Sequence, residues 1–594
     1  MRKMAAIDDH KELTMAISSG KMTRVSSVLG AGLRNHAGTK GLLQLCWRAI
    51  EGKYSPSPEE AEMMLGVTLM RVGGARLAGI AHRALGLPSV TTFRRNTVIR
   101  PLLPSAGIPT VKEIEANIDA CFDAFHQVLM LDEIATEKRA RYDDRTNMVV
   151  GVCRQHGHKL PLELQTESDL SVLCEGLREE RAHLAGEATV AALGVLSSEP
   201  REYSAKPILF SADCKRETGP QHAVNILRPL TAAIKNKSIR KNTTFRLLCA
   251  ASDGESRRGK AFVMEYMQHP LREDSPIFPH LSGLEFMNFL VGEDDMTADK
   301  DTKHALKCLR SLAMRDAGIE VRGFCITNGV ASRTIKSLLN PNDKQDVAIW
   351  TLPDAPAGST PSFIFGRLAY NLVMPYICVD FDLETQLTHL SAAAHLLLDL
   401  YTHDNARAKF MPLQTFLNLM IMIKNAYFCV AKTKVDIPEG KFWLILLGTD
   451  RLEVFFGLIR SAIGTDSNVD LLQLASRGSG LCEVAVIMAI HPEWDRSPRR
   501  ITLPAVGDAG TVLDSKVDHL NPVSWKGNTE VRRVTPLTCW IKGRKMVEEF
   551  VPQSRAVFAR LARDPRVDIM SPFGRLLVEQ YDEEDIQEAY RCRE

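Results

Sequence analysis

Apolar residues recur along the chain with two different periods, and the change of period divides the chain into segments. Helical spacing, with apolar residues three and four positions apart, is found near residues 58–86 and again at 111–125. Residues 1–125 are therefore predicted to form a helical N-terminal region. The helical period returns later in three long runs, at residues 300–316, 386–403 and 411–432.

Between these helical segments, short apolar runs predict four β-strands. They lie at residues 128–131, 147–153, 207–212 and 245–251. The second run is the expected partner of the first, because the turn-like residues 143–147 separate them. Residues 165–198 are expected to be helical or irregular, and residues 221–234 to form an amphipathic helix. The resulting order, β-β-β-α-β, is the arrangement of a ribonuclease-H-like core.

These elements predict an α/β ribonuclease-H-like core that a large helical insertion interrupts, with helical N-terminal and mixed C-terminal regions. The core is expected at residues 126–262 and 440–480, and the insertion at residues 263–439. Residues 481–594 contain several proline-rich breaks and form the C-terminal region.

Composition narrows the class of protein only slightly. The 594 residues are 45% hydrophobic and 25% charged, which is ordinary for globular domains, and the length suggests several of them. A net charge of +2 gives no overall basic signature, so nucleic-acid binding would need a local basic surface. The 13 cysteines follow no compact disulfide pattern, and we expect reduced thiols in an intracellular protein.

The two most apolar stretches are predicted to be buried core helices. Residues 411–431 carry Lys424 and Asn425 in mid-run, and residues 361–382 carry Arg367 and Pro375. A charge at the centre of a bilayer is costly, so we expect no membrane span.

Three carboxylates in distinct local contexts carry the candidate chemistry. Asp132 and Asp253 each follow an apolar run that is read as a buried strand, and Glu453 lies on an amphipathic helix. If the two strands are neighbours, both aspartates lie at one sheet edge and Glu453 can reach them from a helix packed on the sheet. Carboxylate oxygens suit a pair of hard divalent cations, which drive phosphodiester chemistry. The alternative for each acid alone is a solvated surface position.

Neighbouring acids refine this trio. Asp450 is three residues before Glu453, so both face the same side of the helix, and Asp450 is a candidate auxiliary metal ligand. Asp213 also ends a strand, but its position fits the third strand better than the first. Glu133 and Glu255 are expected to be exposed neighbours of the key aspartates.

A second motif is a polar stripe on the helix at 300–316. Its members recur every third residue, and they are Asp301, His304, Lys307 and Arg310. One acid, one histidine and two bases suit phosphate or nucleotide binding, although a solvated helix face has the same pattern.

Two further constellations are weaker. Cys153, His156 and His158 have donors for zinc, but a fourth ligand is missing from the local sequence. Arg257 and Arg258 follow Asp253 and can meet phosphates, although surface exposure explains them equally well.

Together these motifs resemble the P-element-like transposases, the superfamily that includes the THAP-type enzymes. The resemblance rests on Leu131-Asp132-Glu133, on Ser252-Asp253-Gly254, on the stripe that begins at Asp301, with Ser311 where the family has asparagine, and on the helix containing Asp450, Glu453, Phe455-Phe456-Gly457 and Arg460. It covers about residues 126–480. The wider sequence also looks like large proteins of mushroom-forming fungi.

The resemblance implies a function and a set of ligands. In that family three acids bind Mg²⁺ or Mn²⁺ and drive DNA strand cleavage and strand transfer; here they would be Asp132, Asp253 and Glu453. It also implies a nuclear location and DNA as a partner. Some members of the family use GTP, which here would bind the stripe that begins at Asp301.

The chain departs from the family at its N-terminal end. No THAP-type zinc finger is seen in residues 1–120, which are expected to serve packing or homo-oligomerisation. DNA recognition through another domain, a truncated chain or loss of transposition would each account for this. Two alternatives to an active transposase therefore stay open: a catalytically inactive DNA- or protein-binding derivative, and a helical scaffold with merely exposed acids.

Overall fold

The computed structural model describes most of the chain. Its described residues are 11–19, 25–34, 36, 38–52, 60–96, 101–121, 126–198, 204–240, 246–332, 361–403, 405–462, 468–494, 506–507, 513, 517–577 and 579–580. The chain divides into two compact units. The first comprises residues 1–101, 455–469 and 476–495, and the second residues 102–454, 470–475 and 496–594.

The first unit is helical in its described part. Its N-terminal helices are α2 (Val25–Arg34), α3 (Thr39–Ile50), α4 (Glu60–Leu85) and α5 (Val90–Asn96). Val67, Met70 and Phe93 form a small apolar core together with Ile487 of α22 (Leu471–Ile490). The sequence prediction of helix near residues 58–86 is confirmed by α4.

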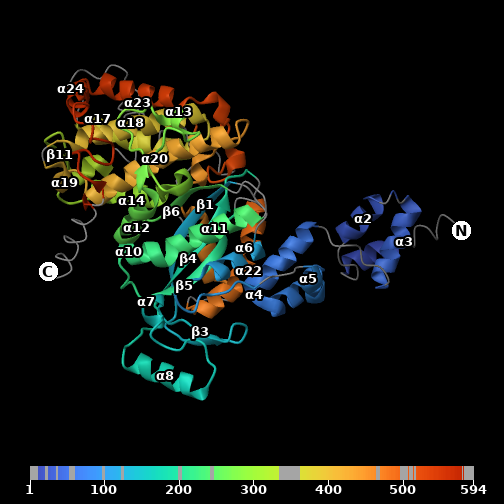
Figure 1. Ribbon diagram of the computed structural model, residues 1–594. Helices are drawn as coiled ribbons and strands as arrows, with labels where there is room; N and C mark the ends of the chain where they lie inside the picture. The colour runs from blue at the N-terminus through green and yellow to red at the C-terminus, as the bar shows by residue number, and fades with distance from the viewer. Residues whose placement is uncertain are drawn as a thin grey trace. The chain divides into compact units, whose positions relative to one another are not determined.

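The second unit is built around a five-stranded mixed sheet with the order β5-β4-β1-β6-β9 (Figure 1). The strands are β1 (His126–Ala135), β4 (Glu187–Val195), β5 (Lys206–Asp213), β6 (Arg246–Ser252) and β9 (Thr297–Lys300). On one side of β1 the pairing with β4, and of β4 with β5, is antiparallel. On the other side β6 and β9 run parallel to β1. The carboxyl ends of three parallel strands therefore meet at one edge.

The predicted partner of β1 was wrong. Residues 147–153 do not pair with it; β3 (Met148–Val150) pairs with β2 (Arg141–Asp143) in a separate hairpin around the predicted turn. The antiparallel neighbour of β1 is β4, which falls in the segment expected to be helical or irregular. β4 is rich in alanine and buried on both faces, so it lacks the alternation that marks a strand.

Helices cover the sheet. The predicted amphipathic helix is part of a continuous helical run of α10 (Gly219–His222), the π-helical turn η1 (Ala223–Leu227) and α11 (Arg228–Arg240). α6 (Val111–Cys121) packs on both α11 and β5, and α12 (Ser256–Tyr266) packs on α10 and β9. A small excursion after β3 holds α7 (Arg154–Gly157) and α8 (Glu167–Arg178).

A second helical layer packs against β9 at the sheet edge (Figure 1). Its long helices are α17 (Pro361–Ile377), α18 (Leu383–Tyr401), α20 (Leu413–Asp436) and α23 (Pro536–Phe550). α14 (Thr302–Ala313) follows β9 directly, and α21 (Asp450–Ser461) follows the short turn η3 (Leu444–Leu446). The remaining elements of this part are α13 (Phe278–Leu281), β7 (His269–Pro270), β8 (Leu290–Val291), β10 (Ile319–Val321), β11 (Phe324–Ile326), α19 (Ala406–Lys409) and α24 (Ser554–Leu561).

Three described helices, α4, α20 and α22, are long and apolar enough to cross a membrane by length and composition alone. In α20, 94% of the most apolar window is buried inside the protein, which confirms the prediction of a core helix there. Two of its buried polar residues have partners inside the protein: Lys424 Nζ donates to Asn288 Oδ1 at 2.8 Å, and Thr297 Oγ1 donates to Asn425 Oδ1 at 2.6 Å.

Candidate active site

Asp132 and Asp253 lie side by side at the edge where the parallel strands end. In the β1–β6 ladder Leu131 is the partner of Ser252, and each aspartate is the next residue along its strand. β1 itself continues to Ala135, but beyond Leu131 it pairs only with β4. The condition on which the predicted site depends, that the two strands are neighbours in one sheet, is met by this register.

Arg258 sits between the two aspartates. Its side chain is only 1% exposed, and Nη2 donates to Asp253 Oδ1 at 2.7 Å, while Nη1 lies 3.8 Å from Asp132 Oδ1. Nη1 also donates to the carbonyl oxygen of Leu131 at 3.1 Å. α12 begins just after β6, which brings Arg258 back over the strand ends. A buried guanidinium requires such partners, because desolvating an unpaired charge is costly.

In each aspartate, only Oδ1 is held by contacts with described residues. Oδ1 of Asp132 accepts from the backbone N–H of Glu133 at 2.8 Å, and Oδ1 of Asp253 from that of Glu255 at 3.0 Å. No hydrogen bond from a described residue reaches Oδ2 of either acid. The side chains are 18% and 31% exposed respectively, so the Oδ2 atoms stay open to a ligand from solvent.

The two aspartates have opposite pKa shifts. Burial raises the pKa of Asp132 to about 6, and the nearby Asp253 adds to this while Arg258 opposes it. Burial also opposes ionisation of Asp253, but Arg258, the Glu255 N–H and Lys300 outweigh it and lower the pKa of this carboxyl. Paired acids with pKa values pushed apart are characteristic of catalytic sites.

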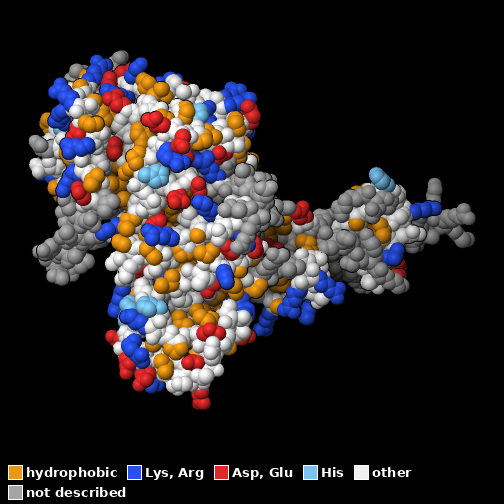
Figure 2. Space-filling view, in the orientation of Figure 1, with side chains coloured by type: hydrophobic (Ala, Val, Ile, Leu, Met, Phe, Trp, Pro, Cys, Tyr) orange, Lys and Arg blue, Asp and Glu red, His pale blue; other side chains and the backbone are white. Residues whose placement is uncertain are grey.

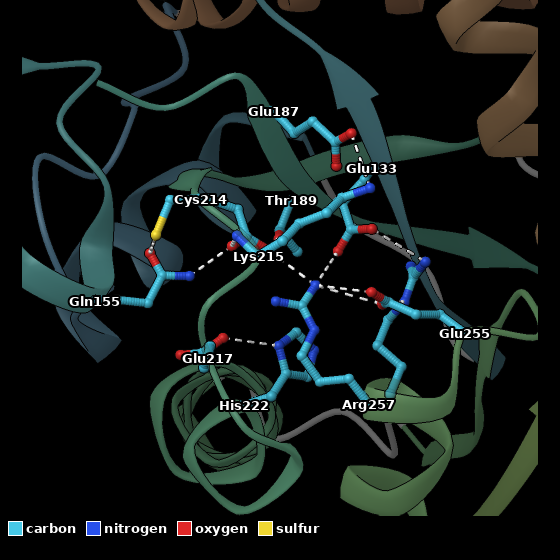
Figure 3. Close-up of polar contacts among 12 residues, drawn as sticks. Glu133, Gln155, Glu187, Thr189, Cys214, Lys215, Glu217, His222, Glu255 and Arg257 are labelled. Carbon is cyan, nitrogen blue, oxygen red and sulfur yellow. Dashed lines mark hydrogen bonds and ion pairs between the residues drawn. The ribbon is translucent and has the colours of Figure 1, made fainter. Parts of the chain in front are cut away.

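Glu133 and Glu255 were wrongly expected to be exposed, and of the two alternatives for Arg257 and Arg258 the structure excludes simple surface exposure. Arg257 donates to Glu133 at 2.9 Å, Asp213 at 3.0 Å and Glu255 at 3.2 Å, as Figure 3 shows for the two glutamates. Glu133 is 9% exposed, and burial raises its pKa to about 7. The arginines are buried because the acids beside them neutralise their charge, an effect that linear sequence does not reveal.

Asp213 is in the place predicted for it, at the end of β5 and two strands away from β1. Its carboxylate receives Arg154 Nη2 at 3.1 Å as well as Arg257. These cations outweigh burial and hold the pKa of Asp213 far below its usual range. Arg154 also pairs with Glu217 at 2.7 Å, and Glu217 contacts His222, seen at the base of Figure 3. These ion pairs form a structural network that is connected to the candidate active site through Arg257.

The four residues of the predicted stripe on α14 lie in different environments in the structure. Asp301 follows β9 and caps α14, with Oδ1 accepting from the N–H of His304 at 2.6 Å. The His304 ring lies against Gly254, since a Cβ there would come within 2.8 Å of its Nε2. Lys307 and Arg310 are exposed on the following turns. Nucleotide binding by these four residues stays a prediction, and Asp301 has both oxygens already engaged.

The second oxygen of Asp301 helps to place Glu453. Asp301 Oδ2 accepts from the N–H of Thr449 at 3.2 Å, and Asp299 Oδ2 from that of Gly448 at 2.8 Å. Gly448 has a φ of +80°, a conformation that glycine adopts without strain. Asp299 on β9 and Asp301 just after it therefore hold the two residues that precede α21, and the helix carries Glu453 in its first turn.

Glu453 is a half-buried carboxylate that makes no hydrogen bond or ion pair with a described residue. Burial raises its pKa, and so do the charges of Asp301 and Asp450, while Lys307 and Lys303 oppose them. Asp450, the predicted helper, forms an ion pair with Lys303. Glu453 is thus held in a position where burial disfavours its charge, and a bound cation would favour it.

The three predicted acids are not gathered as tightly as a bound metal would hold them. In the described part of the chain, the group of three potential donors within 4.8 Å of one another is a different one, Cys153, His156 and Cys214. Asp132 and Asp253 share one edge, and Glu453 lies beside Asp301 at the neighbouring strand end.

Comparison with known proteins adds one similarity. No family model matches the chain, and no curated protein matches it in sequence. Among solved structures, it is similar to the Drosophila P element transposase strand transfer complex, with 15% sequence identity and a TM-score of 0.43. The match covers 73% of this chain and 93% of that one. At this level of similarity, the chemistry of the site has to be argued from its own residues.

Proposed function

We propose that this protein is a metal-dependent polynucleotidyl transferase that cleaves and joins DNA strands, as the transposases that its motifs resemble do. Asp132, Asp253 and Glu453 would hold Mg²⁺ or Mn²⁺. The observation that carries the proposal is the pair of aspartates at adjacent parallel strand ends, each with one oxygen held by the protein and the other open.

The sheet supports this proposal through its order. Three antiparallel strands continued by two parallel ones, β5-β4-β1-β6-β9, are what a ribonuclease-H-like core requires. In such a core the central strand and its parallel neighbour supply the two aspartates. A helix from a distant segment then supplies the third acid, as α21 does for Glu453.

The donor set fits a hard divalent cation. Carboxylate oxygens are the ligands that Mg²⁺ and Mn²⁺ prefer. A bound pair of cations would activate the attacking oxygen and stabilise the leaving one. The other residues of the site would position the metal ligands. Arg258 holds Oδ1 of Asp253, lies near Oδ1 of Asp132 and balances part of the negative charge, and Asp299 and Asp301 fix the start of α21.

DNA is the substrate that the surroundings favour. Lys307 and Arg310 are exposed on α14, one and two turns beyond His304, and can meet a phosphate backbone near the acids. On the face shown in Figure 2, by contrast, basic and acidic side chains are mixed, without one continuous basic stripe. DNA is therefore expected to bind at the sheet edge that carries the candidate active site. A DNA substrate in turn implies a nuclear location.

Nicking of supercoiled plasmid tests the proposal directly. We expect the full-length protein to nick DNA with Mn²⁺ and not with EDTA, and Asp253→Asn to lose at least 100-fold in rate. Asp274→Asn is the matched control, because the side chain of Asp274 is exposed. We expect this variant to retain activity. Equal nicking by the wild type and Asp253→Asn would refute the proposal.

A second candidate is a binding protein that keeps the fold without the chemistry. The observation in its favour is Arg258, which already balances part of the charge of Asp132 and Asp253 without a metal. This candidate requires DNA binding that is indifferent to Mg²⁺ and unchanged by Glu453→Gln. Metal-dependent binding that Glu453→Gln abolishes would exclude it.

A further inference from the structure

Outside the acid edge, a cluster of soft donors lies where α7, β4 and β5 meet. Cys153 Sγ is 3.3 Å from His156 Nδ1, and Cys214 Sγ is 3.9 Å from the same nitrogen. All three donor atoms lie within 4.8 Å of one another. The sequence suggested Cys153 and His156 with His158; the structure replaces His158 by Cys214, which is 61 positions after Cys153 (214 − 153).

The backbone builds this cluster from two directions. Cys153 is the N-cap of α7, and His156 is in the same turn, with its N–H donating to the Cys153 carbonyl at 3.3 Å. Cys214 follows the last residue of β5. The N–H of Cys153 donates to the carbonyl oxygen of His183 at 2.9 Å, so the segment leading into β4 is tied to the same place.

We propose that Cys153, His156 and Cys214 bind a structural zinc ion, with His183 as the fourth ligand. Zinc takes thiolate sulfur at about 2.3 Å and imidazole nitrogen at about 2.0–2.1 Å in a tetrahedron, which sets neighbouring donors roughly 3.3–3.8 Å apart. The sulfur–nitrogen distances of 3.3 and 3.9 Å are close to that range. The donors are therefore already spaced for the ion.

His183 is a further possible donor beside the cluster. Its ring meets that of His156 edge to face, with centroids 4.8 Å apart. Arg216 Nη1 donates to His183 Nε2 at 2.7 Å, so Nδ1 would be the ligand atom. Binding of the ion would require the ring to turn until Nδ1 faces the cluster. The resulting Cys₂His₂ set is a common structural zinc site.

The ion would tie the end of β5 to the start of α7. The residues between Cys153 and His156 are Arg154 and Gln155, and both donate to Asp213, next to Cys214 (Figure 3 shows Gln155 and Cys214). Asp213 holds Arg257, and Arg257 holds Glu133. Zinc at this place would stabilise the network beneath the acid edge, whether or not that edge is catalytic.

Metal analysis of the full-length protein tests the proposal. We expect one zinc per chain in protein purified under reducing conditions without added chelator. Replacement by Co²⁺ should give the thiolate-to-metal charge-transfer absorption and the intense visible bands of a tetrahedral site. Cys153→Ser and Cys214→Ser should each lose the metal, whereas Cys174→Ser, at an exposed free cysteine, should keep it. The cobalt spectrum needs only the wild type, so a poorly folding variant does not decide the test.

Two histidine variants assign the fourth ligand. His183→Ala should weaken zinc binding by about 10-fold or more in a competition with a chromophoric chelator, and His158→Ala should leave it unchanged. The reverse result would reject His183. Wild-type protein that carries no zinc and gives no cobalt spectrum after reconstitution would overturn the whole proposal, as would a Cys153–Cys214 disulfide in the freshly purified protein. Zinc content should be the same in Asp253→Asn, which separates this site from the proposed function.

Discussion

The backbone N–H of Thr449 donates to Asp301 Oδ2 at 3.2 Å, joining two residues that lie 148 positions apart in the sequence. With the matching bond from Gly448 to Asp299, this contact fixes the start of α21 against β9. These bonds, with those of Arg451 and Asp450 in the first turn of α21, hold Glu453 in place, and its own side chain makes no hydrogen bond or ion pair with a described residue. The geometry of the site therefore depends on residues that carry no chemistry.

Gly448→Ala tests that dependence. A Cβ at Gly448 would lie 3.1 Å from Asp301 Oδ2, and its φ of +80° is unfavourable for alanine. We expect a loss of about 2–3 kcal/mol in the free energy of unfolding, from strain and crowding together, and a loss of nicking.

Gly323→Ala is the control for strain alone. Gly323 has a φ of +81°, but nothing lies within 4 Å of its Cβ position. This variant should lose only about 1–2 kcal/mol and keep its activity. Equal effects of the two substitutions on urea denaturation and on nicking would contradict the proposed anchoring.

Arg258→Met should be strongly destabilising. The buried guanidinium has carboxylate partners in Asp132, Asp253, Glu133 and Glu255. Removing it leaves buried charges unpaired, with an expected cost of about 3–5 kcal/mol in urea denaturation at pH 8. The cost should be smaller at pH 5, because the acids can then take up protons. Arg228→Met, which removes an exposed ion pair with Glu265, should cost less than about 1 kcal/mol at either pH.

Asp299→Asn should remove part of the pH dependence of stability. Burial raises the pKa of Asp299 from 3.8 to about 7. The folded protein therefore holds a proton that the unfolded chain lacks between pH about 4 and 7, and the free energy of unfolding falls as the pH rises through this window. A difference of about three pKa units corresponds to about 4 kcal/mol. The variant should match the wild type near pH 4 and be more stable at pH 8; parallel pH profiles would contradict the assignment.

Glu453→Gln should separate activity from stability. Its carboxylate has no partner among the described residues and lies near Asp301 and Asp450, so removing the charge should leave the melting temperature unchanged or raise it slightly. Nicking with Mn²⁺ should fall by at least 100-fold. Asp450→Asn breaks the ion pair with Lys303 and should lower the melting temperature, which distinguishes a structural helper from a metal ligand.

Much of the sheet could be predicted from the sequence, but two of its strands could not. β5 and β6 are apolar runs that end at acids, so their period and their ends were visible. β4 was missed because alanine and glycine are read as helix or loop unless burial is known. β9 is a run of Thr-Ala-Asp-Lys that is buried throughout, and only its tertiary partners make such a polar strand possible.

The candidate site shows the same limit. Asp132, Asp253 and Glu453 could be selected because motif order is a property of the sequence. The burial of Arg258 and the donors His183 and Cys214 depend on chain segments that only folding brings together. His158 was grouped with Cys153 and His156 because it is close to them in the sequence, and Cys214, 58 positions after His156, was not considered.

The attachment of α21 to β9 also governs when the site can exist during synthesis. Asp253 lies 200 positions (453 − 253) and Asp132 lies 321 positions (453 − 132) before Glu453, and synthesis proceeds at roughly 5–20 residues per second. A nascent chain could form the sheet early and would still lack the helix acid for about 10–40 s. A polypeptide released early, before Gly448, would carry two of the acids and would lack the third. Under the proposed function, such an incomplete product would not be able to cut DNA.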